Sequence, residues 1–169
     1  MKKQKKGVMG WLKDIMLILF FVIVVNFAID IYHAKSTLSG VVPELVTRSI
    51  QGDNIDIIKM SKNKPVLIYF WGTWCPVCSR VSPYVNFMAH YYPVVSVALT
   101  SGNDSRVQEY LHGKKYNMVT INDPKGLISK QWSVYVTPTI FVVNKGKITS
   151  VTTGFTTPIG MWIRLFFSS

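Results

Sequence analysis

The sequence predicts an α/β fold with a mixed central sheet flanked by helices. Apolar runs of strand length alternate with helix-like segments between residues 65 and 132, which is typical of strands joined by helices. Two further β-prone runs then flank Asn-Lys-Gly-Lys at residues 144–147, which indicates a closing antiparallel hairpin. With 49% apolar and 16% charged residues, a chain of this length holds one compact domain and an appendage.

The appendage is the N-terminal segment. Residues 15–29 carry no charge, and four lysines precede residue 7. A helix rises about 1.5 Å per residue, so some 20 residues span a hydrocarbon core of about 30 Å. Lysines favour the cytoplasmic side, which places the residues after about Asp30 on the far side of the membrane. We therefore predict a basic N-terminus and transmembrane signal-anchor helix over residues 1–34, and an extracytoplasmic domain over residues 35–169.

A cleaved secretory signal is the alternative for this segment. Cleavage requires small residues near the cut, and the two plausible sites end in Asn26-Phe27-Ala28 and Tyr32-His33-Ala34. Large side chains stand there, so an anchor is favoured. Both alternatives place the domain outside the cytoplasm.

The net charge of +11 does not point to nucleic acid. Five of the 19 basic and two of the eight acidic residues precede residue 35, which leaves the domain with +8. These charges are scattered singly along the chain, without an Arg-rich stripe or a nucleic-acid motif. A solvated basic surface is the better interpretation.

The first half of the domain contains a hairpin, a strand and a helix, after a polar tether at residues 35–43. Residues 45–60 hold two β-prone runs around Gln-Gly-Asp-Asn, which predicts a hairpin. Residues 65–71 (PVLIYFW) form an unbroken apolar run, as expected for a strand buried on both faces. Apolar residues at helical spacing predict a helix over residues 76–91, with a kink at Pro83; they are Val77, Val81, Val85 and Met88.

The second half adds four strands and three helices. A helix from Ser105 to Lys114 begins behind Asp104 as a possible N-cap, and a final helix begins with a proline, as helices often do. We expect the Leu-Phe-Phe tail of that last helix to face the core. The predicted strands are residues 94–99, 118–121, 139–143 and 148–153, and the other predicted helices are residues 127–132 and 158–167.

Both cysteines of the chain lie in FWGTWCPVCSR, residues 70–80. Thiol-disulfide exchange needs one accessible thiolate and a second sulfur close enough to resolve the mixed disulfide. Cys75 stands at or just before a helix start, where backbone N–H groups stabilise a thiolate. Cys78 lies one turn later, and Pro76 occupies a position where its missing N–H costs nothing. The spacing therefore predicts a reversible dithiol.

Other uses of two cysteines fit less well. Zinc wants four ligands, and the three histidines, His33, His90 and His112, are scattered. Covalent haem attachment needs a histidine directly after the second cysteine, where Ser79 stands. A structural disulfide across two residues closes too small a loop to stabilise the fold much. Two thiolates that hold Cu(I) are the serious alternative.

The sequence resembles the thioredoxin-like superfamily, in its membrane-anchored branch of TlpA-like thiol-disulfide oxidoreductases, from about Pro43 to the C-terminus. FWGTWCPVC is similar to the FWAxWCxxC signature, Val-Thr-Pro-Thr at residues 136–139 to the cis-proline loop, and Pro83 and Gly154 stand at positions typical of the family. Within that branch, WGTWCPVC and the ending GFTTPIGMWIRLFF are similar to the suppressor for copper sensitivity D proteins.

This resemblance implies a thioredoxin fold with an N-terminal hairpin extension and an inserted strand and helix. It implies that Cys75 attacks, that Cys78 resolves, and that Pro138 is cis and packs against the dithiol. The backbone of Thr137 would pair with an incoming peptide strand. Trp74, with Pro76 and Val77, would form the surface that receives substrate proteins.

One position departs from the family pattern. Many cytoplasmic thioredoxins have a buried aspartate six residues before the first cysteine, and here that residue is Tyr69. Deprotonation of Cys78 must then draw on another source, and we expect nearby Arg80 to face solvent. We expect Trp71 to lie in the core and assign Trp132 and Trp162 to packing, with His90 and His112 on the surface.

The predicted function is that of a protein disulfide oxidoreductase anchored in the inner membrane, with its domain in the periplasm. We expect it to exchange disulfides with partner proteins, without a cofactor, metal or nucleic acid. A reductant supplied by a transmembrane electron donor is favoured, in copper-stress or cytochrome-maturation pathways. A Cu(I)-binding module and a membrane-tethered adaptor with an unused dithiol are the alternatives.

Overall fold

The computed structural model describes residues 11, 13–18, 20, 21, 25 and 42–168. Most of the predicted anchor and tether therefore lies outside the described residues. The described residues before position 26 are helical. Within the part of the chain that is described, no helix is both long enough and apolar enough to cross a bilayer.

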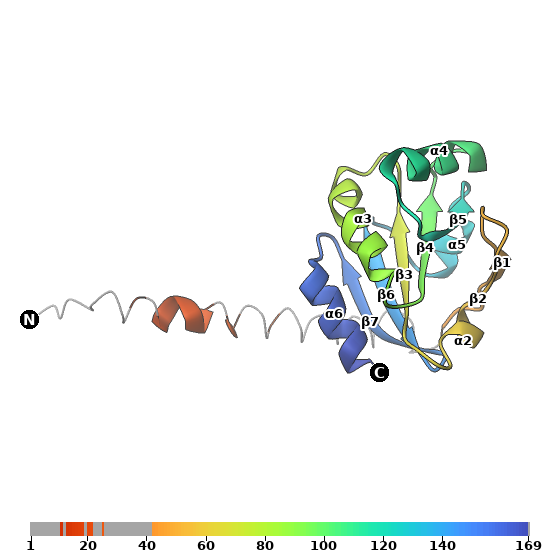
Figure 1. The fold of residues 1–169 in the computed structure, drawn as a ribbon. Helices are drawn as coiled ribbons and strands as arrows, with labels where there is room; N and C mark the ends of the chain where they lie inside the picture. Colours follow the sequence, from red (N-terminus) through yellow and green to blue (C-terminus); the bar gives the residue numbers. More distant parts are fainter. Residues whose placement is uncertain (1–10, 12, 19, 22–24, 26–41, 169) are drawn as a thin grey trace, which may run out of the picture.

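A five-stranded mixed sheet lies at the centre of the domain (Figure 1). Its strand order is β5-β4-β3-β6-β7. β4 pairs in parallel with β3 and β5, whereas β6 is antiparallel to both β3 and β7. This is the predicted sheet and the fold of thioredoxin-like proteins. The strands are β3 (Val66–Trp71), β4 (Val94–Leu99), β5 (Val119–Asp123), β6 (Thr139–Asn144) and β7 (Lys147–Thr153).

Helices cover both faces of the sheet, which explains the unbroken apolar run of β3. Every residue of β3 is buried, and alternate side chains enter two separate cores. Leu67, Tyr69 and Trp71 pack toward α3 (Pro76–Met88), α4 (Asp104–Lys114) and α6 (Pro158–Phe167). Ile68 and Phe70 pack on the other side, toward the N-terminal hairpin and Trp132. Trp71 and Trp132 are therefore core residues, as predicted.

The hairpin is confirmed, although it is shorter than predicted. β1 (Val46–Arg48) pairs antiparallel with β2 (Asn54–Asp56), but the residues that follow form a short helix, α2 (Ile57–Met60). Asp56 redirects the chain, because its carboxylate accepts a 2.9 Å hydrogen bond from the backbone N–H of Lys59 and caps the helix.

Between β4 and β6 lie α4, β5 and α5 (Leu127–Gln131), at the positions predicted for a helix, a strand and a second helix. One cap in this region differs from the prediction. Asn103, and not Asp104, caps α4 by accepting a hydrogen bond from the N–H of Arg106. Asp104 instead accepts a 2.7 Å hydrogen bond from Asn122, which joins α4 to β5.

The last helix differs from the prediction in the direction of its aromatic tail. α6 begins at Pro158, as predicted, and buries Met161 and Leu165. Phe166 and Phe167 are 67% and 75% exposed. They follow the buried Leu165 by one and two residues, so the turn of 100° per residue carries them away from the core. The expectation that the whole tail faces the core was wrong.

Candidate dithiol site

The loop after β3 is held against the end of β4. The backbone N–H of Thr73 donates to Ser101 Oγ at 3.0 Å, and the indole N–H of Trp74 donates to the carbonyl of Leu99 at 3.2 Å. The indole covers Gly72 so closely that a Cβ there would lie 2.7 Å from the ring. Glycine at this position therefore lets Trp74 lie over the loop.

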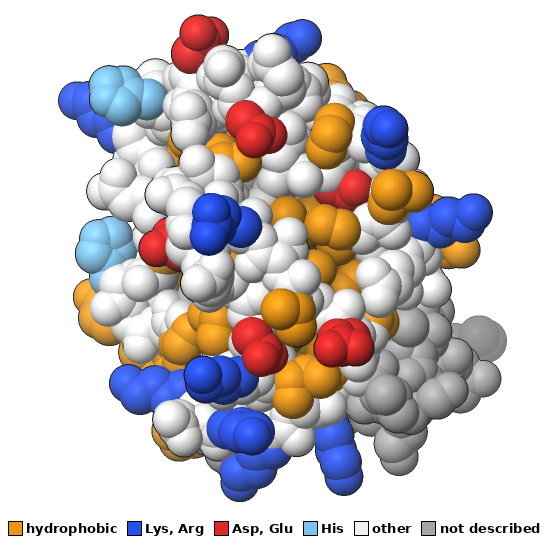
Figure 2. Space-filling model, turned by 90° about the vertical axis from the view of Figure 1, so that its right-hand side faces the viewer, with side chains coloured by type: hydrophobic (Ala, Val, Ile, Leu, Met, Phe, Trp, Pro, Cys, Tyr) orange, Lys and Arg blue, Asp and Glu red, His pale blue; other side chains and the backbone are white. Residues whose placement is uncertain are grey.

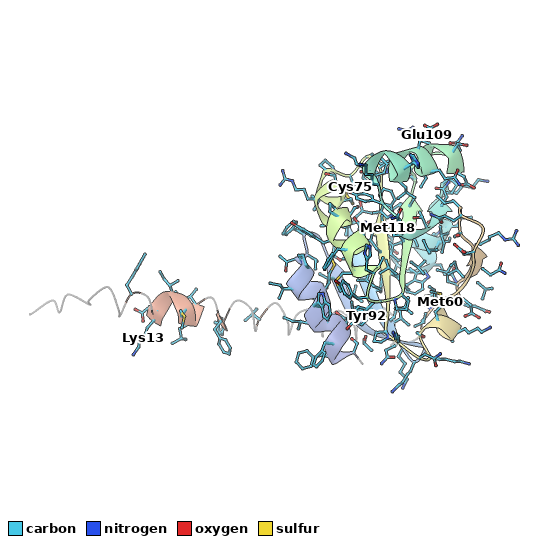
Figure 3. The ribbon with its side chains drawn as sticks, viewed as in Figure 1. Lys13, Met60, Cys75, Tyr92, Glu109 and Met118 are labelled. Atoms are coloured by element: carbon cyan, nitrogen blue, oxygen red, sulfur yellow. A yellow bond between two sulfur atoms is a disulfide. The ribbon has the colours of Figure 1, made fainter. Side chains whose placement is uncertain are left out.

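Cys75 and Cys78 form a disulfide at the start of α3, with their Cα atoms 5.2 Å apart. Figure 3 shows Cys75 at the upper end of α3, the end toward which the β3 and β4 arrows of Figure 1 point. Cys75 is the N-cap residue of α3, and Pro76 opens the helix. Cys75 is 5% exposed and Cys78 is fully buried, so the first sulfur is the more accessible of the two.

The helix terminus provides the electrostatic environment of Cys75. The backbone N–H of Cys78 donates to Cys75 Sγ at 3.1 Å. In the reduced protein, this N–H and the positive end of the helix dipole favour the thiolate over the thiol. The same geometry makes Cys75 the better leaving group when a mixed disulfide is resolved.

A cis-proline loop faces the dithiol. The Thr137–Pro138 peptide bond is cis, as the resemblance implied. The carbonyl oxygen of Thr137 lies 3.7 Å from Cys75 Sγ, and Pro138 is buried while Thr137 is half-buried. Gly154, directly after β7, holds this loop, because its N–H donates to the carbonyl of Pro138 at 2.8 Å. Its φ of +85° is one that glycine adopts readily.

Apolar side chains surround the disulfide. Trp74 is 57% exposed and Val77 is 41% exposed, and Pro76 is also exposed. The structure adds Val136, which is 57% exposed and directly precedes Thr137. Val136 was not among the site residues predicted from the sequence, although an apolar residue before a Thr-Pro loop was the available signal. Arg80 is exposed, as predicted.

Two hydroxyl groups lie beneath the first turn of α3. Tyr69 is fully buried, and its hydroxyl lies 3.0 Å from Ser82 Oγ and donates to the carbonyl of Cys78 at 3.3 Å. Burial raises the pKa of Tyr69 well above its ordinary value, and the hydrogen bond to Ser82 only partly opposes this. Tyr69 and Ser82 are therefore both uncharged at physiological pH. Many cytoplasmic thioredoxins have a carboxylate at the position of Tyr69.

Replacing Tyr69 with phenylalanine tests this pair. We expect Tyr69→Phe to lower the free energy of unfolding by about 1 kcal/mol near neutral pH, because Ser82 and the carbonyl of Cys78 lose a partner. The folded state holds the phenolic proton more tightly than the unfolded state, whose pKa is 10.0. This difference in proton binding contributes fully to the free energy of unfolding below about pH 10. Above that pH the free energy of unfolding falls, by up to about 1.4 kcal/mol per pH unit.

Urea unfolding at neutral pH and above pH 10 measures both effects. The variant should lose less stability than the parent on the alkaline side. Tyr135→Phe is the matched control, because Tyr135 is 83% exposed. If both variants followed the same alkaline curve, the assignment of the buried hydroxyl would be wrong.

The described residues hold no group of three or more His, Cys, Asp and Glu side chains arranged to bind a metal ion. His90 and His112 are both exposed, as predicted. Cys78, one of the two sulfurs that a copper ion would need, is fully buried behind Cys75.

The chain is similar to one family model, to curated relatives and to solved structures. The model of the AhpC/TSA family matches residues 40–151. A thioredoxin-like protein of Haemophilus influenzae is 46% identical over 133 residues, which cover 76% of this chain and 80% of the relative. The thiol-disulfide oxidoreductase ResA of Bacillus thuringiensis is 30% identical over 68% of both chains. The crystal structure of StoA from Bacillus subtilis superposes with a TM-score of 0.63 at 26% identity, covering 73% of this chain and 97% of StoA.

Proposed function

This chain belongs to the AhpC/TSA family and is a thiol-disulfide oxidoreductase of the type that its relatives represent, and from this premise we propose that it is a membrane-anchored reductant of disulfides in proteins outside the cytoplasm. The observation that supports this most directly is the position of Cys75. Its sulfur caps α3, accepts the N–H of Cys78 and lies beside the cis Pro138.

In the proposed reaction, the reduced Cys75 thiolate attacks one sulfur of a substrate disulfide. A bond forms between Cys75 and that sulfur, and the other substrate sulfur leaves as a thiolate that takes a proton from solvent. Cys78, after losing its proton, attacks Cys75 Sγ and releases the second substrate thiolate. Two electrons pass to the substrate, and the Cys75–Cys78 disulfide seen in the structure is the product.

The surroundings of the disulfide suit an extended peptide. Thr137 is half-buried and its neighbour Val136 is exposed, so this backbone edge lies within reach of a strand added from a substrate. Trp74, Pro76 and Val77 supply apolar surface on the other side of the sulfurs. We propose that this surface receives the substrate. Because Tyr69 and Ser82 are uncharged hydroxyls, we propose that water or the substrate accepts the proton of Cys78.

We further propose where the protein lies in the cell and which protein reduces it. The apolar segment at residues 15–29 would hold the domain at the periplasmic side of the inner membrane, and a transmembrane donor would return electrons to the disulfide. We propose that the protein belongs to the TlpA-like branch, near the suppressor for copper sensitivity D proteins, and that it works in copper-stress defence or cytochrome maturation. No cofactor takes part.

A reduction potential tests the direction of electron flow. The protein is equilibrated in glutathione buffers, and the fraction of Cys75–Cys78 disulfide is read by alkylation and mass spectrometry. We expect a value nearer to about −270 mV than to about −120 mV, which are the potentials of a general reductant and a strong oxidant. A value near −120 mV would overturn the reductant role. Stoichiometric Cu(I) binding without insulin reduction would favour the copper-binding alternative.

A further inference from the structure

The outer face of α6 is apolar. Four of its residues recur at positions i, i+3, i+4 and i+7 and are exposed, and a fifth follows them. They are Ile159 (72%), Trp162 (39%), Ile163 (43%), Phe166 (67%) and Phe167 (75%). The inner face of the same helix buries Met161 and Leu165. We call the five exposed residues the α6 outer face; they form a continuous apolar stripe that the described domain leaves uncovered.

Aromatic side chains extend this stripe toward the end of α3. The ring of Trp162 lies 5.7 Å from that of Tyr91 and 5.6 Å from that of Tyr92. Tyr91 in turn contacts Phe87, whose ring is 5.3 Å away. Tyr91 is 52% exposed and Phe87 is 48% exposed. The apolar surface is therefore bordered by tryptophan and tyrosine, the side chains that are enriched where a bilayer meets water.

Lysines adjoin the same surface. Five exposed lysines come from two neighbouring segments, α2 with the turn after it and the β6–β7 turn with the first residue of β7. Hydrogen bonds hold the two segments together, because the N–H groups of Lys145 and Gly146 donate to the carbonyl and hydroxyl of Ser61. Figure 2 shows basic side chains gathered along the lower edge of the molecule, the end at which Figure 1 places α2 and the C-terminus. We call them the lysine cluster; they are Lys59, Lys62, Lys64, Lys145 and Lys147.

A recess of about 480 Å³ joins the lysine cluster to the aromatic border. Lys64 and Lys145 line it together with Tyr91, Tyr92 and Trp162. The end of α6 is tied to the same turn, because Asn144 donates a hydrogen bond to the carbonyl of Ser168. Aromatic and cationic side chains therefore meet at this recess, at one end of the apolar stripe.

We propose that the α6 outer face and the lysine cluster dock the domain on the surface of a bilayer that contains anionic lipids. Ile and Phe side chains would enter the boundary of the acyl chains, Trp162 and the tyrosines would lie at headgroup level, and the lysines would pair with lipid phosphates. The charge of the cluster complements an anionic surface. It does not favour a second copy of this chain, which would carry the same five lysines.

The inference rests on the proposed membrane anchor, and the chain length is compatible with it. Twelve residues, 30–41, separate the apolar segment from the first described residue of the domain, and they reach at most about 40 Å when extended. A domain of this size has a radius of gyration of about 14 Å. An anchored domain therefore stays close enough to the bilayer to lie on it.

Docking through α6 leaves the dithiol free. Figure 3 shows Cys75 at one end of α3 and Tyr92 beyond the other end. The 13 residues of α3 are about 20 Å long, so the disulfide lies about that far from the aromatic border at the other end of this helix.

The experiment uses the full chain reconstituted in vesicles that contain a phospholipid with a photoactivatable headgroup. After illumination, the labelled peptides are identified by mass spectrometry. We expect label in residues 158–168 when the vesicles contain phosphatidylglycerol, and a several-fold loss in phosphatidylcholine alone or at high salt. Each lysine near an anionic surface contributes about five-fold to binding, so Lys64→Gln with Lys145→Gln should also lower this label several-fold.

Matched variants separate docking from general effects. Phe166→Ser with Phe167→Ser should abolish most of the α6 label, whereas Leu127→Ser should not, because Leu127 is equally exposed on α5. Lys125→Gln with Lys130→Gln is the matched control for the charge, since both lysines are exposed elsewhere. Equal labelling in all variants, or protection of α6 by a cross-linked dimer, would overturn the inference.

Two further readings distinguish this inference from the function on which it rests. Release of the chain from vesicles by alkaline carbonate would refute the anchor and the docking together. If the unmodified chain resisted carbonate and reduced insulin but showed no label in α6, docking alone would be refuted.

Discussion

Cys75→Ser is expected to lower disulfide reduction by at least about 1,000-fold, because a serine hydroxyl is not ionised at neutral pH and cannot form the mixed disulfide. Cys78→Ser should behave differently. It keeps the attacking sulfur at the N-terminus of α3 and removes the resolving sulfur, so it should accumulate a mixed disulfide with its substrate. The two variants therefore separate the two steps of the reaction.

The measurement is insulin reduction for Cys75→Ser and non-reducing electrophoresis for Cys78→Ser. The trapped species should disappear with dithiothreitol and should be absent when both cysteines are replaced. Ser79→Ala is the control, because Ser79 is exposed in the same helical turn and its hydroxyl contacts only the carbonyl of Pro76 among the described residues. An active Cys75→Ser variant, together with no trapped species in Cys78→Ser, would exclude the assigned roles.

The sequence predicts the sheet well because the strands and the helices bury their residues in different patterns along the chain. β3 is covered on both faces and therefore appears as an unbroken apolar run, and β6 and β7 flank a turn with glycine at a φ of +70°. The predictions were wrong where a single contact, or the extent of the core, determines how a segment ends. Asp56 caps α2 and ends a strand that propensity alone would continue, and Phe166 and Phe167 continue an apolar segment beyond the part that the core covers.

The site is predictable where its chemistry depends on spacing. The sequence itself shows two cysteines separated by two residues and a Thr-Pro pair before an apolar strand. In the structure, Cys75 Sγ lies 3.7 Å from the carbonyl oxygen of Thr137. The supporting contacts depend on tertiary structure. Ser101 meets Thr73 across 28 positions, and Ser82 meets Tyr69 across 13, so their roles could not be read from the sequence.

Trp132→Ala is expected to have the largest effect on stability. Trp132 is fully buried at the end of α5, with its ring 5.9 Å from that of Phe70 and 5.2 Å from that of Phe141. Truncation removes apolar contacts and leaves a cavity, which costs about 3–5 kcal/mol of the free energy of unfolding. Phe70 belongs to β3, directly before Trp71, so the loss also loosens the strand that carries the dithiol loop.

Trp132→Phe provides the matched comparison. The indole N–H of Trp132 has no hydrogen-bond partner among the described residues, so phenylalanine removes no hydrogen bond and keeps part of the ring contact. We expect it to cost less than half as much as alanine. Urea unfolding of the full chain in detergent, followed by pulse proteolysis, measures the midpoints. If alanine left the midpoint unchanged, or if Leu127→Ala at the exposed start of α5 cost as much, the packing of Trp132 would not stabilise β3 as inferred.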